Sequence, residues 1–381
     1  MTQAELSSLF AYAVDIRRKL HAYPEVGFDL PHTTALVAAE LHAMGIVPTD
    51  KYGVCSLVGE IGRGEKLIAL RADMDALPVN EEVDLPFRSQ IPGQMHACGH
   101  DAHTAILLAA ARYLKAHEAE LPCRVRLIFQ PSEEGQQSGA QMMVENGVMD
   151  GVDHIICTHC DHALDSGFIG VRTGDYMAAC VPATVRFIGH SAHATLPEDG
   201  ADAIAMAAEA YARMKEMIVR EAGGTPYIWS VGRFAGGTVH NVIADKCEMD
   251  ISFRFYDMAL EERVRRQVFA ICEAAAAHFG GRVEFDWHIS TGPVINNAAV
   301  TEAFTARCAA EGLPIRQVER RMSSEDFGWY LTKAPGMLFR FGTKNESKGC
   351  TGAVHCSDFK LDEDSMPLAI RAFCSYILSR K

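Results

Sequence analysis

The densest group of chemistry-bearing residues in this chain lies at 95–104, which reads MHACGHDAHT. One thiol, one carboxylate and three imidazoles gather there, just before an expected helix. Thiolate and imidazole are preferred ligands of zinc-like divalent metals, and the C-x-H pair of Cys98 and His100 can aim both side chains at one point. Any one of these residues could be a core thiol or a surface histidine. Three histidines beside one cysteine at a strand-to-helix turn favour a metal site.

A second group is the acidic pair of Glu133 and Glu134 in the segment FQPSEEG. It follows an expected buried strand, and open α/β sheets place their sites at the carboxyl ends of their strands. Adjacent side chains point in different directions, so one acid can bind metal while its neighbour moves protons. Taken alone, the segment fits a solvated acidic turn better than a catalytic pair.

Two more histidine-bearing segments are THCDH at 158–162 and AVHCSD at 353–358. Taken one at a time, such histidines are more often surface residues than ligands. Four strand-end segments that offer Cys, His, Glu and His ligands are, however, what a two-metal site requires, because two ions about 3.5–4 Å apart need ligands from several elements.

Two other kinds of active site do not match in detail. The segment GHSAH at 189–193 resembles a G-x-S-x-G nucleophile elbow but lacks the final glycine. The sequence has no G-x-x-x-x-G-K-[ST] loop and no G-x-G-x-x-G after a strand, so no motif supports nucleotide binding.

The helices and strands that must position these groups are predicted to form an α/β fold. Continuous apolar strands are expected at 66–79, 123–129 and 152–159, with a helix at about 101–117 between the first two. Strands without polar alternation, separated by helices, indicate a mostly parallel sheet covered on both faces. A later strand near 336–341 and a final helix at about 364–379 extend this catalytic domain.

From about Pro182 the pattern changes to that of a split β-α-β-β-α-β unit, which is a ferredoxin-like α+β arrangement. We therefore expect a catalytic metal-binding domain formed by residues 1–178 and 292–381, with a smaller domain at 179–291 inserted into it. The expected order is strand 182–189, helix 200–220, strand 226–233, strand 243–256, helix 259–279 and strand 282–290.

Composition limits the partners and the compartment. The chain of 381 residues has 36 Lys and Arg against 49 Asp and Glu, a net charge of −13 that argues against a nucleic-acid partner. No apolar run reaches the roughly 18 residues that a spanning helix needs, and the N-terminus lacks a signal-type apolar segment. The 12 cysteines are scattered through apolar segments and are expected to be reduced thiols. These features predict a soluble, cytoplasmic protein with no membrane partner.

Six motifs together resemble the metal-dependent aminoacylase/carboxypeptidase family. Within that family they resemble the branch of hippurate hydrolases and indole-acetyl-amino-acid hydrolases, and the resemblance covers about residues 12–375. The motifs are HAYPEVGF (21–28), RADMDALPV (71–79), MHACGHDAHT (95–104), QPSEEG (130–135), SSEDF (323–327) and VHCSDF (354–359).

The resemblance implies a two-metal amidohydrolase whose inserted domain is a lid or dimerisation domain. It implies Glu133 as the general base that deprotonates a metal-activated water and hands the proton to the departing amine. Five positions match the metal ligands of the branch: Cys98, His100, Glu134, His159 and His355.

Three further site residues are implied within the lid. His193 matches a lid histidine that stabilises the oxyanion, usually from the partner subunit of a homodimer. Asn241 and Arg254 match lid positions suited to the carboxylate of the substrate, although Arg254 could also be a surface strand residue.

One departure from the branch concerns the third strand. Many members follow its histidine with an apolar residue, tryptophan and proline, whereas this chain reads His159-Cys160-Asp161-His162. Either His159 or His162 could be the ligand, and His159 is favoured because it ends the apolar strand. The change puts the usual aromatic acyl groups in doubt. Asp73 is expected to orient a ligand histidine rather than to bind metal.

The leading hypothesis is hydrolysis of an N-acyl amino acid or related small amide by two divalent ions per chain. A thiolate ligand favours softer ions, while carboxylate and imidazole also suit manganese, so we expect manganese or zinc and leave cobalt and nickel open. Two alternatives remain: a dipeptidase or carboxypeptidase of the same fold, and a non-catalytic metal-binding or peptide-binding protein. The intact Glu133 argues against the second alternative.

Overall fold

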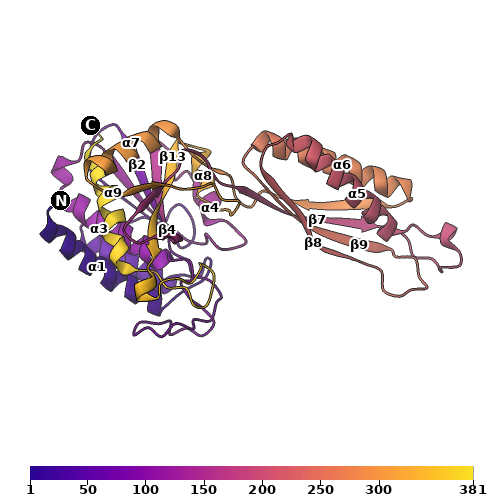
Figure 1. Ribbon diagram of the computed structural model, residues 1–381, viewed down its shortest axis with the longest axis horizontal. Coiled ribbons are helices and arrows are strands. Elements are labelled where there is room, and N and C mark those ends of the chain that lie inside the picture. The colour runs from indigo at the N-terminus through magenta and orange to yellow at the C-terminus, as the bar shows by residue number, and fades with distance from the viewer. Residues whose placement is uncertain (381) are drawn as a thin grey trace. The chain divides into compact units, whose positions relative to one another are not determined.

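The computed structural model describes residues 1–380, which divide into two compact units (Figure 1). The large unit comprises residues 1–176, 294–320 and 326–380. The small unit comprises residues 177–293 and 321–325. No helix within residues 1–380 is both long enough and apolar enough to cross a bilayer.

A seven-stranded, mostly parallel sheet forms the centre of the large unit, as the sequence predicts. β2 runs parallel to both β3 and β4, and β4 runs parallel to β13. β1 is antiparallel to β3, and β5 is antiparallel to β13. In spatial order the strands are β1 (Leu57–Ile61), β3 (Arg124–Gln130), β2 (Leu67–Asp73), β4 (His154–Asp165), β13 (Gly336–Lys344), β5 (Ile169–Val171) and β12 (Ile315–Gln317). A separate pair consists of β6 (Gly174–Met177) and β11 (Val294–Asn296).

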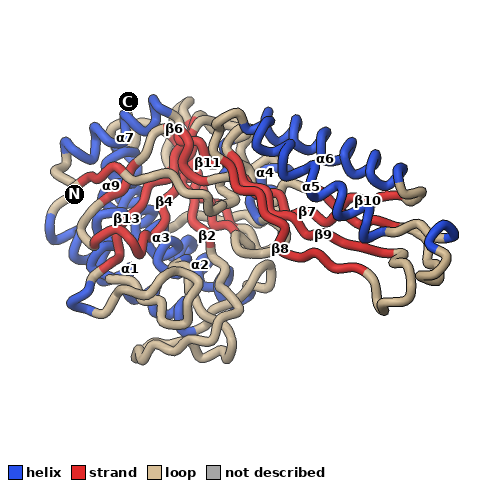
Figure 2. Tube along the Cα trace, turned by 45° about the vertical axis from the view of Figure 1, so that its right-hand side comes forward, coloured by secondary structure: helices blue, strands red, loops and turns tan. Residues whose placement is uncertain are grey.

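Helices cover the strands of this sheet, and Figure 2 shows them in blue around the red strands. The first helix begins at a capping box in which Thr2 and Glu5 each accept a hydrogen bond from the other's backbone N–H. The helices of the large unit are α1 (Gln3–Ala22), α2 (Pro31–Ala43), α3 (His100–Ala116), α4 (Gly139–Glu145), α7 (Ala298–Ala310), α8 (Gly328–Leu331) and α9 (Met366–Leu378).

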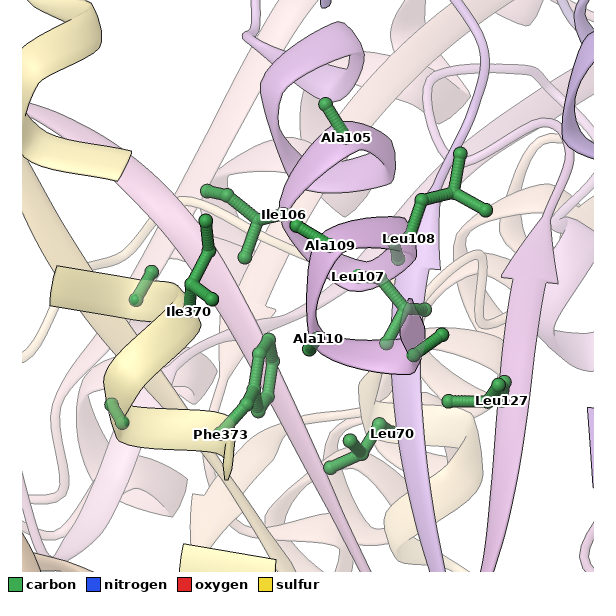
Figure 3. Close-up of a cluster of buried hydrophobic side chains, with 14 of the residues drawn as sticks. Leu70, Ala105, Ile106, Leu107, Leu108, Ala109, Ala110, Leu127, Ile370 and Phe373 are labelled. Atoms are coloured by element: carbon green, nitrogen blue, oxygen red, sulfur yellow. The ribbon is translucent and has the colours of Figure 1, made fainter. Parts of the chain in front are cut away.

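Helix α3 is the centre of the core, and it begins at the metal-ligand motif. It is buried on nearly every side, because it lies between the sheet and helix α9 (Figure 3). Leu107 and Leu108 belong to the same buried cluster as Leu70 of β2, Leu127 of β3 and Phe373 of α9. Truncating one such buried leucine to alanine costs about 2–5 kcal/mol. The start of α3 is therefore held firmly relative to the sheet.

The small unit is a four-stranded antiparallel sheet with two helices packed on it. Its spatial strand order is β10-β7-β9-β8, which is the order of a split β-α-β-β-α-β unit. Strand β7 alternates buried and more exposed residues, as expected when one face of a sheet is covered. The elements are β7 (Ala179–Ile188), α5 (Ala203–Ala222), β8 (Tyr227–Gly236), β9 (Lys246–Phe255), α6 (Met258–His278) and β10 (Arg282–Trp287).

A short segment from the SSEDF motif region also belongs to the small unit. Residues 321–325 are bound there by backbone and side-chain hydrogen bonds: Ala178 N–H donates to Ser323 O at 3.0 Å, and Tyr256 OH donates to Arg321 O at 2.7 Å. The next residue, Asp326, belongs to the large unit.

Candidate metal centre

The carboxyl ends of three adjacent parallel strands place the acidic and histidine motifs at one edge of the large sheet. β2 ends at Asp73, β3 ends at Gln130, and the double glutamate follows three residues later. These two strands pair in register, with Asp73 opposite Gln130. The edge is the one at which open α/β sheets bind their ligands.

Strand β4 differs from the prediction. His159 does not end the strand, because β4 continues to Asp165 and stays paired with β13 beyond the end of β2. The last pairing between β2 and β4 joins Arg71 to Cys157. Two residues beyond this pair, β2 ends at Asp73 and β4 reaches His159. His159 is therefore level with the end of β2, although it lies inside a longer strand.

The turn at Cys98-Gly99-His100 requires glycine for two reasons. Gly99 has φ 82°, in the left-handed region that favours glycine, and a Cβ there would lie only 2.8 Å from the Sγ of Cys160. The turn brings Cys98 onto the edge of the sheet, where its Sγ lies 3.4 Å from Nε2 of His159. His100 begins α3 directly after the turn.

All five predicted ligands come together at this edge. The ligand atoms of Cys98, His100 and His159 lie within 4.8 Å of one another, and so do those of Cys98, Glu134 and His355. Nε2 of His355 lies 3.0 Å from Oε1 of Glu134. His159 is almost fully buried, whereas His162 is half-buried.

Glu133 adjoins this five-residue cluster. Its Oε2 lies 3.9 Å from Nε2 of His100, and Glu134 Oε1 lies at the same 3.9 Å from that nitrogen. One carboxylate oxygen of each glutamate therefore lies equally far from the same nitrogen of His100.

The unmet hydrogen-bonding needs of His100 fit a metal ion. Among the described residues, its Nε2 is buried without a hydrogen-bond partner, since the nearest carboxylate oxygens are 3.9 Å away. Buried polar atoms in folded proteins nearly always have a partner. A cation bound between this nitrogen, Cys98 and the carboxylates would supply one.

The local charge also fits a cation. Burial lowers the pKa of His100, but the carboxylates of Asp73, Asp75 and Glu134 outweigh burial and raise that pKa to about 10. Burial and the neighbouring carboxylates raise the pKa of the Cys98 thiol well above its usual value. A bound divalent ion would reverse this effect on the thiol, because the ion becomes the largest local charge.

Asp75, which the sequence interpretation did not single out, binds the backbone of both glutamates and lies beside His100. Its Oδ1 accepts the backbone N–H of Glu133 at 2.9 Å, and its Oδ2 accepts that of Glu134 at 3.0 Å. Oδ1 also lies 3.4 Å from Nδ1 of His100. Its only signal in the sequence is its place as the second aspartate of RADMD.

Asp73 has a different partner from the one expected. Its Oδ1 lies 2.6 Å from Nδ1 of His103, whereas Nδ1 of the predicted ligand His100 is 3.9 Å away. Nε2 of His103 accepts the backbone N–H of Cys160 at 2.8 Å. Asp73 is thus linked through His103, the last histidine of the 95–104 motif, to the backbone next to His159.

Two site segments have a left-handed backbone at a residue other than glycine. Ser132, just before the double glutamate, has φ 51°, and His355 has φ 67°. Ser132 Oγ donates to Gln137 O at 2.7 Å, and His355 N–H donates to Ala97 O at 2.8 Å. Such conformations cost about 1–3 kcal/mol each and persist where neighbouring contacts enforce them.

The predicted lid residues lie in the small unit. His193 is exposed, and its Nδ1 lies 2.8 Å from Thr195 Oγ1. Ala194 N–H donates to Asn241 O at 3.0 Å, so the loops that carry His193 and Asn241 are adjacent. Arg254 is on β9, and its Nη1 donates to Met322 O at 3.1 Å and to Ser324 Oγ at 2.8 Å.

Comparison with known proteins places this site in a family. Residues 69–379 match the family described as peptidase family M20/M25/M40. The N-acetyl-L-cysteine deacetylase of Bacillus subtilis is 36% identical over 367 residues, which cover 95% of this chain and 86% of the relative. Thermostable carboxypeptidase 1 of Saccharolobus solfataricus is 35% identical over 368 residues, covering 95% of this chain and 93% of the relative.

A solved structure agrees with the sequence comparison. It is described as a dinuclear metal-binding peptidase from the M20 family of Bacillus subtilis, and it matches with a TM-score of 0.84 and 31% identity over 98% of each chain. The chain belongs to peptidase family M20/M25/M40 and is a metal-dependent amidohydrolase. The predicted resemblance and the predicted enzyme class are confirmed.

Proposed function

We propose that this enzyme hydrolyses the amide bond of N-acyl amino acids with two divalent ions held by Cys98, His100, Glu134, His159 and His355. The observation that carries the proposal is the position of Glu133: its Oε2 lies 3.9 Å from Nε2 of His100, as near as Oε1 of Glu134, so a second carboxylate lies among the ligand atoms and is available for proton transfer if Glu134 binds metal. A carboxylate in that place can reach a water held by the cluster. The deacetylase name of one relative supports the choice of an acyl amino acid.

The ions that these five residues would hold would lower the pKa of a bound water, so that hydroxide becomes available near neutral pH. Glu133 takes a proton from that water as its oxygen attacks the carbonyl carbon. The C–N bond then breaks, and Glu133 returns the proton to the departing nitrogen, so the carboxylate ends as it began. Asp75 holds the backbone of Glu133 and Glu134 during these steps through its two hydrogen bonds.

We propose that the small unit is a lid that supplies the remaining contacts. His193 would donate a hydrogen bond to the oxyanion, and Asn241 and Arg254 would bind the carboxylate of the amino acid. Two hydrogen bonds to 322–324 already orient the Arg254 guanidinium. A homodimer formed through this unit would let His193 act on the partner's site.

Manganese and zinc are the ions we propose first, with cobalt and nickel as alternatives. The Cys98 thiolate favours the softer ions, and the histidine ligands with Glu134 also accept manganese. We also propose a cytoplasmic location, in keeping with the free thiols of all 12 cysteines.

A dipeptidase or carboxypeptidase activity is the second candidate, favoured by the carboxypeptidase name of one relative. The two activities differ in the group on the acyl side of the scissile bond. A non-catalytic binding role would not explain why a second carboxylate, that of Glu133, lies beside His100.

The test is a panel of acetyl-amino acids, benzoyl-amino acids and dipeptides, offered to protein reconstituted with each of the four metals. Turnover of acyl amino acids that disappears both on chelation and in Glu133→Ala supports the proposal. Turnover of dipeptides alone supports the second candidate. Full activity of Glu133→Ala, with metal content equal to wild type, would rule out the assigned base.

A further inference from the structure

Asp326, in the SSEDF motif, is a fully buried carboxylate with an unusually complete set of donors. Its Oδ1 accepts from Arg71 Nη2 and from Gln130 Nε2, both at 2.9 Å. Its Oδ2 accepts from Ser138 Oγ at 2.7 Å, Gln130 Nε2 at 2.8 Å and Ala140 N–H at 3.1 Å. A buried charge is tolerated only where hydrogen bonds satisfy it in this way.

These donors come from three different elements around the metal centre. Arg71 is on β2, Gln130 ends β3, and Ser138 caps α4. Arg71 also bonds to Asp73 at 2.6 Å, and Tyr330 OH donates to Gln130 Oε1 at 3.0 Å. The network therefore fixes Asp326 relative to both strands whose ends carry site residues.

The backbone of the same residue reaches Glu133. The N–H of Asp326 donates to Oε1 of Glu133 at 3.4 Å, a long hydrogen bond of the kind that tightens when an active site is occupied. The other oxygen, Oε2, is the one that lies 3.9 Å from Nε2 of His100. The two oxygens of Glu133 thus have different surroundings.

We propose that Asp326 is a positioning residue for Glu133: its anchored carboxylate holds the peptide N–H of residue 326 against Oε1, so that Oε2 stays turned toward His100 and would be the oxygen that takes the proton. The inference rests on the proposed role of Glu133 as the base and adds the group that orients it. Asp326 touches neither substrate nor metal in this scheme.

Asp326→Asn tests the anchor without changing its size. The Nδ2 of asparagine is itself a donor, so it cannot accept from Arg71, Gln130 or Ser138 as the carboxylate oxygen does. The peptide at 326 would then lose its fixed position. We expect kcat to fall roughly 10- to 100-fold, as misplacement of a reacting group does. KM should stay within about threefold of wild type, and calorimetry should still detect both metal ions.

A compensating substitution separates positioning from loss of folding. In the double variant Asp326→Asn with Gln130→Glu, the new carboxylate at position 130 can accept from the amide nitrogen introduced at position 326, from Arg71 Nε and from Tyr330 OH, so the network regains its charge and its donors. We expect the double variant to recover most of the lost kcat and the melting temperature. A melting temperature that recovers while kcat stays low would overturn the proposal.

A double-mutant cycle shows whether Asp326 acts through Glu133. The probe is acetohydroxamate, which binds metal and shares a proton with a neighbouring base; acetate, which has no such proton, is the matched control. By calorimetry, Asp326→Asn and Glu133→Ala should each weaken hydroxamate binding about tenfold, and the two together should weaken it no further. Acetate affinity should be unchanged in all three.

Additive losses in that cycle would mean that Asp326 acts independently of Glu133, and the inference would be wrong. Full kcat in Asp326→Asn would refute it as well. The failure of the proposed function looks different: Glu133→Ala would then keep full activity, whatever Asp326→Asn does.

Discussion

Nε2 of His355 lies 3.0 Å from Oε1 of Glu134, joining a side chain that is 51% exposed to one that is 13% exposed. Both belong to the group Cys98, Glu134 and His355, whereas His159 belongs to the group Cys98, His100 and His159. The two groups share Cys98, and we propose that each would hold one ion.

The first prediction concerns His355→Ala. This variant should keep about one ion per chain, because His100 and His159 remain, and it should lose at least about 100-fold in kcat since two-metal hydrolysis needs both ions. Metal content after gel filtration, measured by mass spectrometry, checks the stoichiometry. Two tightly bound ions in this variant would show that His355 is not a ligand.

The second prediction compares two histidines on one strand. His159→Ala should reduce metal affinity at least about 100-fold, because His159 Nε2 faces Cys98 Sγ at 3.4 Å. His162→Ala is the matched control, three residues further along β4, and should bind both ions with wild-type affinity. Calorimetric titration of chelator-treated protein decides between them, and the reverse pattern would reassign the ligand to His162.

The gathering of the candidate site residues could be predicted from sequence, while the residues that support them could not. Cys98, His100, Glu133 and Glu134 lie within short motifs at strand ends, and a parallel sheet brings such ends to one edge. Their individual roles came from the family resemblance and stay predictions. The role of Asp75 depends on two hydrogen bonds between the segments that follow β2 and β3, which no local pattern reveals.

The extent of β4 was also hidden from the sequence. The apolar run predicts a strand that ends at His159, but pairing with β13 continues past it to Asp165. Tertiary pairing of this kind overrides local composition. The SSEDF segment shows the same limit, because adjacent residues in it bond to different units of the chain.

The third prediction is that Asp75→Asn weakens metal binding about 10- to 100-fold, as loss of a carboxylate that orients ligands does. Asparagine can accept only one of the two backbone N–H groups of Glu133 and Glu134, so the double-glutamate turn would loosen. Asp362→Asn is a suitable control, because Asp362 is also buried and accepts from Asn345 and Lys348, but it touches none of the predicted ligands. Equal metal affinities in the two variants would contradict the role of Asp75.

The fourth prediction concerns pH and His21. Its Nδ1 lies 2.7 Å from Asp101 and its Nε2 lies 3.1 Å from Glu81, so both ring nitrogens donate only when the ring is protonated. Burial lowers the pKa of His21, but these two carboxylates outweigh burial and raise it above the usual 6.5. A raised pKa contributes stability that is fully present below pH 6.5 and is lost as pH rises through the raised value.

His21→Gln should therefore cost about 3 kcal/mol of unfolding free energy at pH 6, and less at higher pH. Denaturant unfolding of chelator-treated protein between pH 6 and pH 9 measures the difference from wild type without a contribution from metal binding. A difference that grows with pH would show that the neutral ring is the stabilising form.

The fifth prediction tests whether His193 acts across a dimer. Glu133→Ala and His193→Ala should each be nearly inactive alone. If His193 is donated in trans, a mixed dimer has one site with both defects and one site with neither, so random exchange of subunits should restore about a quarter of wild-type activity. Donation within one chain would leave every site defective, and the mixture would stay inactive. Light scattering on the same samples establishes whether a dimer is present, and a fully active monomer would exclude donation in trans outright.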